Sequence, residues 1–271
     1  MGRIVLITGA AGGIGRAMVA AALAAGHGVA ALDRDGAALA ALAAAHPGAA
    51  LHPVLADLAT EAGCDHGVAA TLARFGRIDA VVNNAGIGVS SLRPDAETHV
   101  PSIAELDAAT WDRFFAINVR APMLMLRAAL PAMRAAGWGR VVNNTTSFRT
   151  MLRVLPYGAT KAALEAASAV WAAELAGSGI TVNVLIPGGP TDTPFIGAGA
   201  TWPRDQMLRP EVMGPPLAWL LSDAALGVTG QRIIAARWDA AAPAAASAMR
   251  PAGWPELGAD AVWLQGGSGG R

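Results

Sequence analysis

Short runs rich in β-branched residues alternate with alanine- and leucine-rich stretches over the first 236 positions of the chain. Such a short run is typical of a buried strand, and the longer stretch after it is typical of a helix that packs against a sheet. The alternation predicts an α/β fold, a single doubly wound domain with a parallel seven-stranded sheet and helices on both faces. The expected strands are residues 3–8, 28–33, 50–55, 78–83, 140–145, 180–186 and 232–236.

Two connections, residues 86–107 and residues 188–211, are too long for simple alternation. Both follow expected strands, and the carboxyl ends of the strands form the edge at which such sheets bind ligands. Long loops at this edge are often lids or substrate walls.

The composition changes beyond Trp238, where an Ala/Pro stretch leads to a Gly/Ser-rich end. We therefore expect the domain to occupy residues 1–240 and a C-terminal extension to occupy residues 241–271. Trp254 and Trp263 are candidates to anchor part of this extension on the domain or on a neighbouring subunit.

A glycine-rich turn follows the first expected strand and leads into an expected helix over residues 16–25. Glycines let the backbone turn tightly and approach a pyrophosphate closely, and a helix N-terminus supplies unpaired N–H donors. The turn therefore predicts a dinucleotide site. Its candidate cofactor-binding residues are Thr8, Gly9, Gly12, Gly13, Ile14 and Gly15.

Asp33 ends the second expected strand and bears on the choice of cofactor. A carboxylate at this place accepts hydrogen bonds from the ribose hydroxyls of NAD and repels the 2′-phosphate of NADP. The neighbouring Arg34 could pair with that phosphate, so the sequence favours NAD and leaves NADP open.

Charge and composition exclude several classes of protein. Hydrophobic residues make up 54% of the chain, charged residues 15%, and 20 basic residues balance 20 acidic ones. This balance gives no electrostatic drive toward nucleic acid or an anionic membrane. The single Cys64 and the absence of a signal-peptide pattern favour a cytoplasmic protein. The five histidines are scattered without metal-ligand spacing, so we expect no metal.

Tyr157 and Lys161 are the only tyrosine and the only lysine of the chain, and they stand four residues apart at the start of an expected helix. Residues at this spacing share one helical face. A tyrosine phenol has an ordinary pKa near 10, and a neighbouring cation lowers it toward the working range. The pair therefore predicts Tyr157 as the proton-transferring acid or base and Lys161 as its activator.

With these motifs the chain resembles the short-chain dehydrogenase/reductase family, non-extended type, over about residues 3–237. The resemblance implies a Rossmann-type fold, hydride transfer between nicotinamide C4 and an alcohol or carbonyl carbon, and a homodimer or homotetramer. The motifs that carry it are Thr8-Gly9-x-x-x-Gly13-x-Gly15, Asp57, Asn83-Asn84-Ala85-Gly86, Asn118, Tyr157-x-x-x-Lys161 and Pro187-Gly188.

The resemblance also implies roles for single residues. Asp57, with Leu58 beside it, would contact adenine, and Asn83 would lie by the adenosine ribose. Lys161 would also hold the nicotinamide ribose, and Asn118 would support a proton-relay water. The implied cofactor-binding set further includes Ala85, Gly86, Tyr157, Pro187 and Gly188.

The chain departs from the family at the catalytic serine, which usually lies thirteen residues before the tyrosine. Asn144 occupies that position here, and matching the strand pattern instead places Thr146 in the serine's role, with Ser147 as its immediate neighbour. Either hydroxyl could orient the substrate oxygen, and a local turn hydrogen bond is the structural alternative for each. Thr146 is favoured.

A second departure is Pro190, at a place where the family uses a backbone N–H toward the nicotinamide carboxamide. Proline has no N–H. Either the register shifts by one residue, or Thr191 and Thr193 take over this contact, and we expect at least one of the two threonines to be involved.

The sequence thus predicts an NAD-dependent oxidoreductase for a secondary alcohol or ketone. The alternatives are an NADP-linked 3-oxoacyl reductase and a catalytically silent dinucleotide-binding sensor or scaffold. Apolar residues in the two loops after the fifth and sixth expected strands indicate a hydrophobic or amphipathic substrate. They are Met151, Leu152, Leu155, Phe195, Ile196, Trp202 and Met207.

Overall fold

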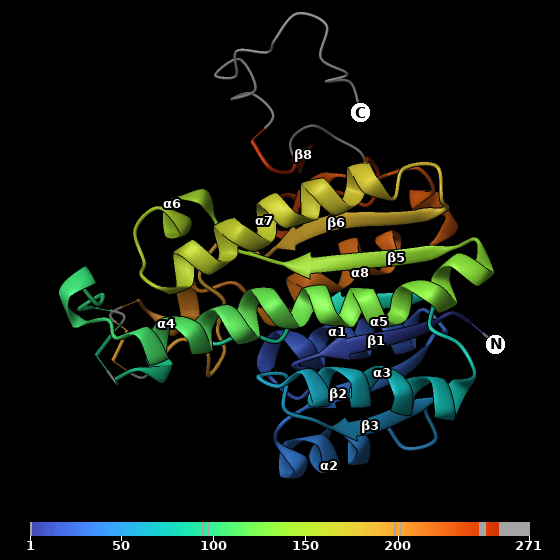
Figure 1. The fold of residues 1–271 in the computed structure, drawn as a ribbon, viewed down its shortest axis with the longest axis horizontal. Coiled ribbons are helices and arrows are strands. Elements are labelled where there is room, and N and C mark those ends of the chain that lie inside the picture. Colours follow the sequence, from blue (N-terminus) through green and yellow to red (C-terminus); the bar gives the residue numbers. More distant parts are fainter. Residues whose placement is uncertain are drawn as a thin grey trace, which may run out of the picture.

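The computed structural model describes residues 2–93, 95–96, 98–197, 199–200, 202–243 and 248–254. Within these residues the chain forms an eight-stranded sheet with the order β3-β2-β1-β4-β5-β6-β7-β8 (Figure 1). Strands β1 to β7 run parallel to one another, which confirms the predicted doubly wound α/β fold. The parallel strands are β1 (Ile4–Thr8), β2 (Gly28–Asp33), β3 (Leu51–Leu55), β4 (Ala80–Asn83), β5 (Gly139–Asn144), β6 (Ile180–Ile186) and β7 (Gln231–Ile234).

The eighth strand, β8 (Met249–Pro251), was not predicted. It pairs antiparallel with β7 at the edge of the sheet, so the sheet is not wholly parallel. Three residues that end in a proline give no period-two pattern, and proline is tolerated in a sheet chiefly at an edge. The expected division at residue 240 stays a prediction. Trp254 contacts the Phe148 ring at a centroid distance of 5.6 Å, and Trp263 lies outside the described residues.

Helices cover both faces of the sheet (Figure 1). Helices α1, α2 and α8 contribute to a core cluster on one face, and α3, α5 and α7 contribute to a cluster on the other. No helix of the described part is long and apolar enough to cross a bilayer. The helices are α1 (Gly13–Ala24), α2 (Gly36–Ala44), α3 (Glu61–Phe75), α4 (Ala108–Phe115), α5 (Ala121–Ala136), α6 (Phe148–Met151), α7 (Tyr157–Glu174) and α8 (Gly214–Leu220), with a π-helical turn at Ala116–Arg120 and 3₁₀ turns at Val89–Ser91, Ile103–Glu105, Arg204–Gln206, Pro210–Met213, Asp223–Ala225 and Ala235–Arg237.

The strand order reverses beside β1. The chain runs from β1 outward to β2 and β3, crosses back, and adds β4 on the other side of β1. The connections after β1 and β4 therefore leave the sheet in opposite directions. Such a reversal opens a crevice at the carboxyl ends of these two strands, which is the usual ligand site of a doubly wound sheet.

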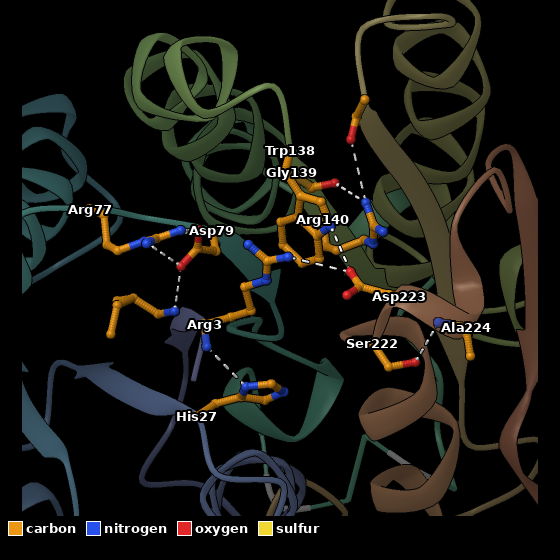
Figure 2. A network of polar contacts seen from close by, with 12 residues as sticks. Arg3, His27, Arg77, Asp79, Trp138, Gly139, Arg140, Ser222, Asp223 and Ala224 are labelled. Carbon is orange, nitrogen blue, oxygen red and sulfur yellow. Dashed lines mark hydrogen bonds and ion pairs between the residues drawn. The ribbon is translucent and has the colours of Figure 1, made fainter. Parts of the chain in front are cut away.

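A polar network holds the amino ends of the strands, opposite this crevice (Figure 2). Asp79, at the start of the β4 segment, is fully buried and accepts a hydrogen bond from the backbone N–H of Ile4 at 2.7 Å. The guanidinium groups of Arg3 and Arg140 each lie 4.0 Å from the ring centroid of Trp138. These contacts tie β1, β4 and β5 together at the end away from the crevice.

Candidate active site

The turn between β1 and α1 leaves no room for a side chain at Gly9 or Gly15. Gly9 has a φ of +61°, and a Cβ atom on it would lie 2.8 Å from the Cα atom of Ala85. A Cβ atom on Gly15 would lie 2.0 Å from the carbonyl oxygen of Gly9. Helix α1 begins at Gly13, so its unpaired first N–H groups lie in the turn. This concave backbone surface at a helix N-terminus fits the pyrophosphate of a dinucleotide.

Asp33 ends β2 beside this turn and lines the same cavity. Its Oδ2 atom accepts a hydrogen bond from the N–H of Ala11 at 3.0 Å, and its Oδ1 atom accepts from the N–H groups of Arg34 and Asp35 at 2.8 and 3.2 Å. These backbone donors hold the carboxylate in place. The side chain of Arg34 also lines the cavity and makes no hydrogen bond or ion pair within the described residues.

The segment after β6 closes the other side of the turn. Gly188, with a φ of +100°, redirects the chain, and Thr191 forms a bridge with Leu208. A Cβ atom on Gly13 would lie 2.5 Å from the Cγ2 atom of Thr193. Of the two candidate threonines, Thr193 therefore packs directly against the glycine turn.

Phe195, in the same segment, lines the cavity beside Tyr157. Its ring centroid is 5.7 Å from that of Tyr157, and its carbonyl oxygen accepts a hydrogen bond from the hydroxyl of Ser90 at 2.7 Å. A Cβ atom on Gly88 would lie 2.5 Å from the Phe195 ring. The two long loops thus meet beside Tyr157.

Tyr157 is the first residue of α7, and Lys161 follows one turn later. The Lys161 side chain is buried, and its Nζ atom donates a hydrogen bond to the carbonyl oxygen of Asn144 at 2.7 Å. The same Nζ atom is 5.7 Å from the centroid of the Tyr157 ring. Burial lowers the pKa of Lys161 to about 8, so the group carries its charge at neutral pH.

Asn118 lies in the π-helical turn between α4 and α5, and π-helical turns occur frequently at functional sites. Its Oδ1 atom accepts from the N–H of Ile87 at 2.9 Å, and its Nδ2 atom donates to the Ile87 carbonyl and to the Thr160 hydroxyl, both at 3.0 Å. Its side chain therefore connects the loop after β4 to helix α7. Its side chain does not line the cavity.

The two hydroxyl candidates after β5 have different partners. Ser147 is the N-cap of α6, and its Oγ atom accepts from the N–H of Thr150 at 3.1 Å. The hydroxyl of Thr146 makes no hydrogen bond within the described residues, and both side chains line the cavity. The local turn interaction thus engages Ser147 and leaves the Thr146 hydroxyl available to a ligand.

A buried ion pair contacts the turn that contains Thr146. The guanidinium of Arg232 on β7 lies 2.6 Å from the carboxylate of Glu165 on α7, and both side chains are at most 3% exposed. Arg232 also donates to the carbonyl oxygen of Thr146, and the Thr145 hydroxyl donates to Glu165 at 2.8 Å. This pair therefore joins the turn after β5 to the helix that carries Tyr157.

These segments enclose a cavity of about 960 Å³ at the crevice beside β1. Three expected site residues lie outside its wall: Thr8, Asn83 and Asn118. The Thr8 hydroxyl accepts from two backbone N–H groups after β4, and Asn83 donates to Asn143 at 2.8 Å. The expected residues that line the cavity are Gly9, Gly12, Gly13, Ile14, Gly15, Asp33, Arg34, Asp57, Leu58, Ala85, Gly86, Thr146, Ser147, Tyr157, Lys161, Pro187, Gly188, Thr191 and Thr193.

Comparison with known proteins identifies the family. A family model described as short chain dehydrogenase matches residues 3–202, which is more than half of the chain. The chain belongs to the short-chain dehydrogenase family. It is therefore an oxidoreductase.

Named relatives of this short-chain dehydrogenase act on several alcohols. It is 35% identical to 2-(R)-hydroxypropyl-CoM dehydrogenase of Xanthobacter autotrophicus, over 79% of this chain and 83% of the relative. It is 34% identical to cis-4-hydroxycyclohexanecarboxylate dehydrogenase of Sinomonas cyclohexanicum, over 84% and 92%. A crystal structure of 3-ketoacyl-(acyl-carrier-protein) reductase from Brucella melitensis complexed with NADH aligns with a TM-score of 0.72 at 29% identity, over 84% of this chain and 94% of that chain.

Some residues that line the cavity were not predicted from the sequence of this short-chain dehydrogenase. Arg149 and Arg153, on and just after α6, line the cavity, and only their position after β5 could have signalled this. Asn84, inside a quoted motif, also lines it. Of the apolar residues expected in the substrate wall, Phe195, Ile196 and Trp202 line the cavity, whereas Met151, Leu152, Leu155 and Met207 do not.

Proposed function

We propose that this chain is an NAD-dependent dehydrogenase or reductase of secondary alcohols and ketones, with Tyr157 as its general acid or base. The observation that supports this proposal is the placement of Tyr157 and Lys161 in the wall of the cavity that contains the glycine turn. A proton-transferring phenol and a dinucleotide cradle within one enclosed space are what alcohol oxidation requires.

The cofactor proposal rests on the backbone of the turn and on Asp33. The backbone of Gly9, Gly13 and Gly15 lines the cavity and would take the pyrophosphate. Side chains are excluded at these positions because a Cβ atom would meet Ala85, Thr193 or the Gly9 carbonyl oxygen. When bound, the nicotinamide cofactor accepts or donates the hydride. The Asp33 carboxylate, already fixed by three backbone donors, is placed to accept hydrogen bonds from a ribose and to repel a 2′-phosphate. NAD is therefore favoured over NADP, although Arg34 borders the same place.

Lys161, Tyr157 and Thr146 have different roles in the proposed proton transfer. Lys161, charged below pH 8, favours the negative form of the Tyr157 phenol next to it. In alcohol oxidation Tyr157 accepts the hydroxyl proton, and in ketone reduction it returns that proton to the oxygen. Thr146, whose hydroxyl is not engaged by the turn, orients the substrate oxygen in preference to Ser147.

The remaining site residues act by position. Asn118 holds the loop after β4 against α7 and would support a relay water, and Thr193 would contact the nicotinamide side of the cofactor. Asp57 and Leu58 lie in the cavity wall beyond β3, where an adenine would bind. Asn83 would act on the ribose indirectly, since its side chain is turned toward Asn143.

A second candidate is 3-oxoacyl reduction with NADP. The aligned 3-ketoacyl-(acyl-carrier-protein) reductase and the unpaired Arg34 in the cavity wall favour it. A third, a silent binding module, would keep the glycine turn and make no use of Tyr157. We also propose a cytoplasmic homodimer or homotetramer, for which light scattering of the purified protein gives the mass directly.

Cofactor titration followed by turnover separates these functions. NADH and NADPH are titrated by fluorescence, and secondary alcohols and ketones are then screened with the tighter cofactor. We expect NADH to bind at least about tenfold more tightly, a difference of about 1.4 kcal/mol. We expect Tyr157→Phe to keep NADH binding and to lose turnover. Equal affinities would favour the second candidate, and unchanged turnover in Tyr157→Phe would reject the proposed mechanism.

A further inference from the structure

Positive charge collects at the catalytic end of the cavity. Arg149 and Arg153 line this end together with Lys161. The acidic residues that line the cavity within the described part of the chain are Asp33 and Asp57, which belong to β2 and to the segment after β3. They therefore lie at the nucleotide end, and no carboxylate of the described residues lines the cavity beside Tyr157.

Both arginines are exposed and without partners. Neither side chain makes a hydrogen bond, an ion pair or a ring contact within the described residues. Other arginines near the site are engaged: Arg204 and Arg209 both pair with Asp192. A guanidinium that is left unpaired in a cavity wall offers its planar set of donors to a ligand anion.

The turn that carries the two arginines is fixed relative to Tyr157. At the start of this turn, the N–H of Thr150 donates a capping hydrogen bond to the Oγ atom of Ser147. A Cβ atom on Gly158 would lie 2.5 Å from the carbonyl oxygen of Met151, so the backbone of this turn rests directly on the first turn of α7. The backbone positions of both arginines are therefore set with respect to the phenol that transfers the proton.

The rest of this end of the cavity is mainly apolar. Val89, Val154 and Ile196 line it, and Phe195 and Trp202 stand at 40% and 48% exposure on its rim. Such a surface takes up a hydrocarbon body, and the arginines would take up a charged group at its far end. We propose that the substrate is a secondary alcohol or ketone whose apolar body carries an acidic group, such as a carboxylate, bound by Arg149 and Arg153. This inference rests on the proposed oxidoreductase function.

Ligand binding tests the inference without turnover. Hexanoate and its neutral analogue hexanamide are titrated by calorimetry into the NADH-loaded protein, into the double variant Arg149→Gln/Arg153→Gln, and into Arg134→Gln as a matched control. Arg134 is an exposed, unpaired arginine on α5 away from the cavity. We expect the parent and the control to prefer hexanoate by about tenfold, as one charge-assisted contact implies, and the double variant to lose the preference. Equal affinity for the two ligands, a preference that survives in the double variant, or no binding of either ligand would overturn the inference.

Turnover separates this inference from the proposed function. The parent is expected to oxidise 5-hydroxyhexanoate with a kcat/KM about tenfold above that for 5-hydroxyhexanamide, and the double variant is expected to treat the two alike. A hexanoate preference that depends on the two arginines, without oxidation of any alcohol, would uphold the acidic-group site and count against the oxidoreductase function. Oxidation of the amide in preference to the carboxylate would support the oxidoreductase function and count against the acidic-group site.

Discussion

The buried charge of Lys161 makes the stability of the protein depend on pH in a defined direction. Burial lowers its pKa from the ordinary 10.5 to about 8. Between these two values the unfolded chain binds a proton that the folded chain does not, so the free energy of unfolding rises with pH. The difference of about 2.5 units corresponds to about 3 kcal/mol, because each unit is about 1.4 kcal/mol.

Urea unfolding at several pH values from 7.5 to 10.5 measures this effect. Tyr157→Phe is compared with Tyr157→Phe/Lys161→Met, because a phenol has an ordinary pKa near 10 and the Tyr157 ring centroid lies 5.7 Å from the Lys161 Nζ atom. Cys64, whose pKa burial raises to about 11, is present in both proteins and cancels. We expect the stability of the lysine-containing protein, relative to the methionine variant, to increase by about 3 kcal/mol from pH 8 to pH 10.5. A stability difference that does not change with pH would refute the reasoning, since Lys161 would then keep its ordinary pKa in the folded state.

Four further substitutions test separate roles of single residues. Asp33→Asn keeps the shape and removes the charge at the ribose, so the preference for NADH over NADPH, measured by fluorescence titration, should fall by about tenfold; an unchanged ratio would contradict this role. Arg232→Met leaves a fully buried carboxylate without its partner and should cost about 3–5 kcal/mol in urea unfolding, whereas a loss below about 1 kcal/mol would show that the pair is dispensable. Thr146→Val should lower kcat/KM by about tenfold or more, and Ser147→Ala should leave it near the parent value while costing about 1 kcal/mol of stability through the lost cap. The opposite pattern would assign the orienting role to Ser147.

The fold could be predicted because its signals are patterns of neighbouring residues in the sequence. Strand and helix periods differ, and glycine spacing marks the one turn where the backbone must approach a ligand closely. The placement of Tyr157 and Lys161 on one face followed from their four-residue spacing, and their being the only phenol and the only lysine of the chain singled them out. Each of these signals lies within one short segment.

What could not be predicted depends on contacts between distant segments. Arg232 and Glu165 are 67 positions apart and meet only because β7 and α7 pack against the same turn. Strand β8 exists because the chain reverses after β7, and no pattern in Met249–Pro251 announces that reversal. The choice between Thr146 and Ser147 depends on which hydroxyl caps α6, which two adjacent hydroxyl residues do not reveal.

The central claim is that the Lys161 charge favours the phenolate of Tyr157. Because Tyr157 is the only tyrosine of the chain, near-ultraviolet difference absorbance against pH reports its phenolate alone. The measurement compares the parent with Lys161→Met. We expect the phenolate band to appear at lower pH in the parent. A band that appears at the same pH in both proteins, or at higher pH in the parent, would contradict it.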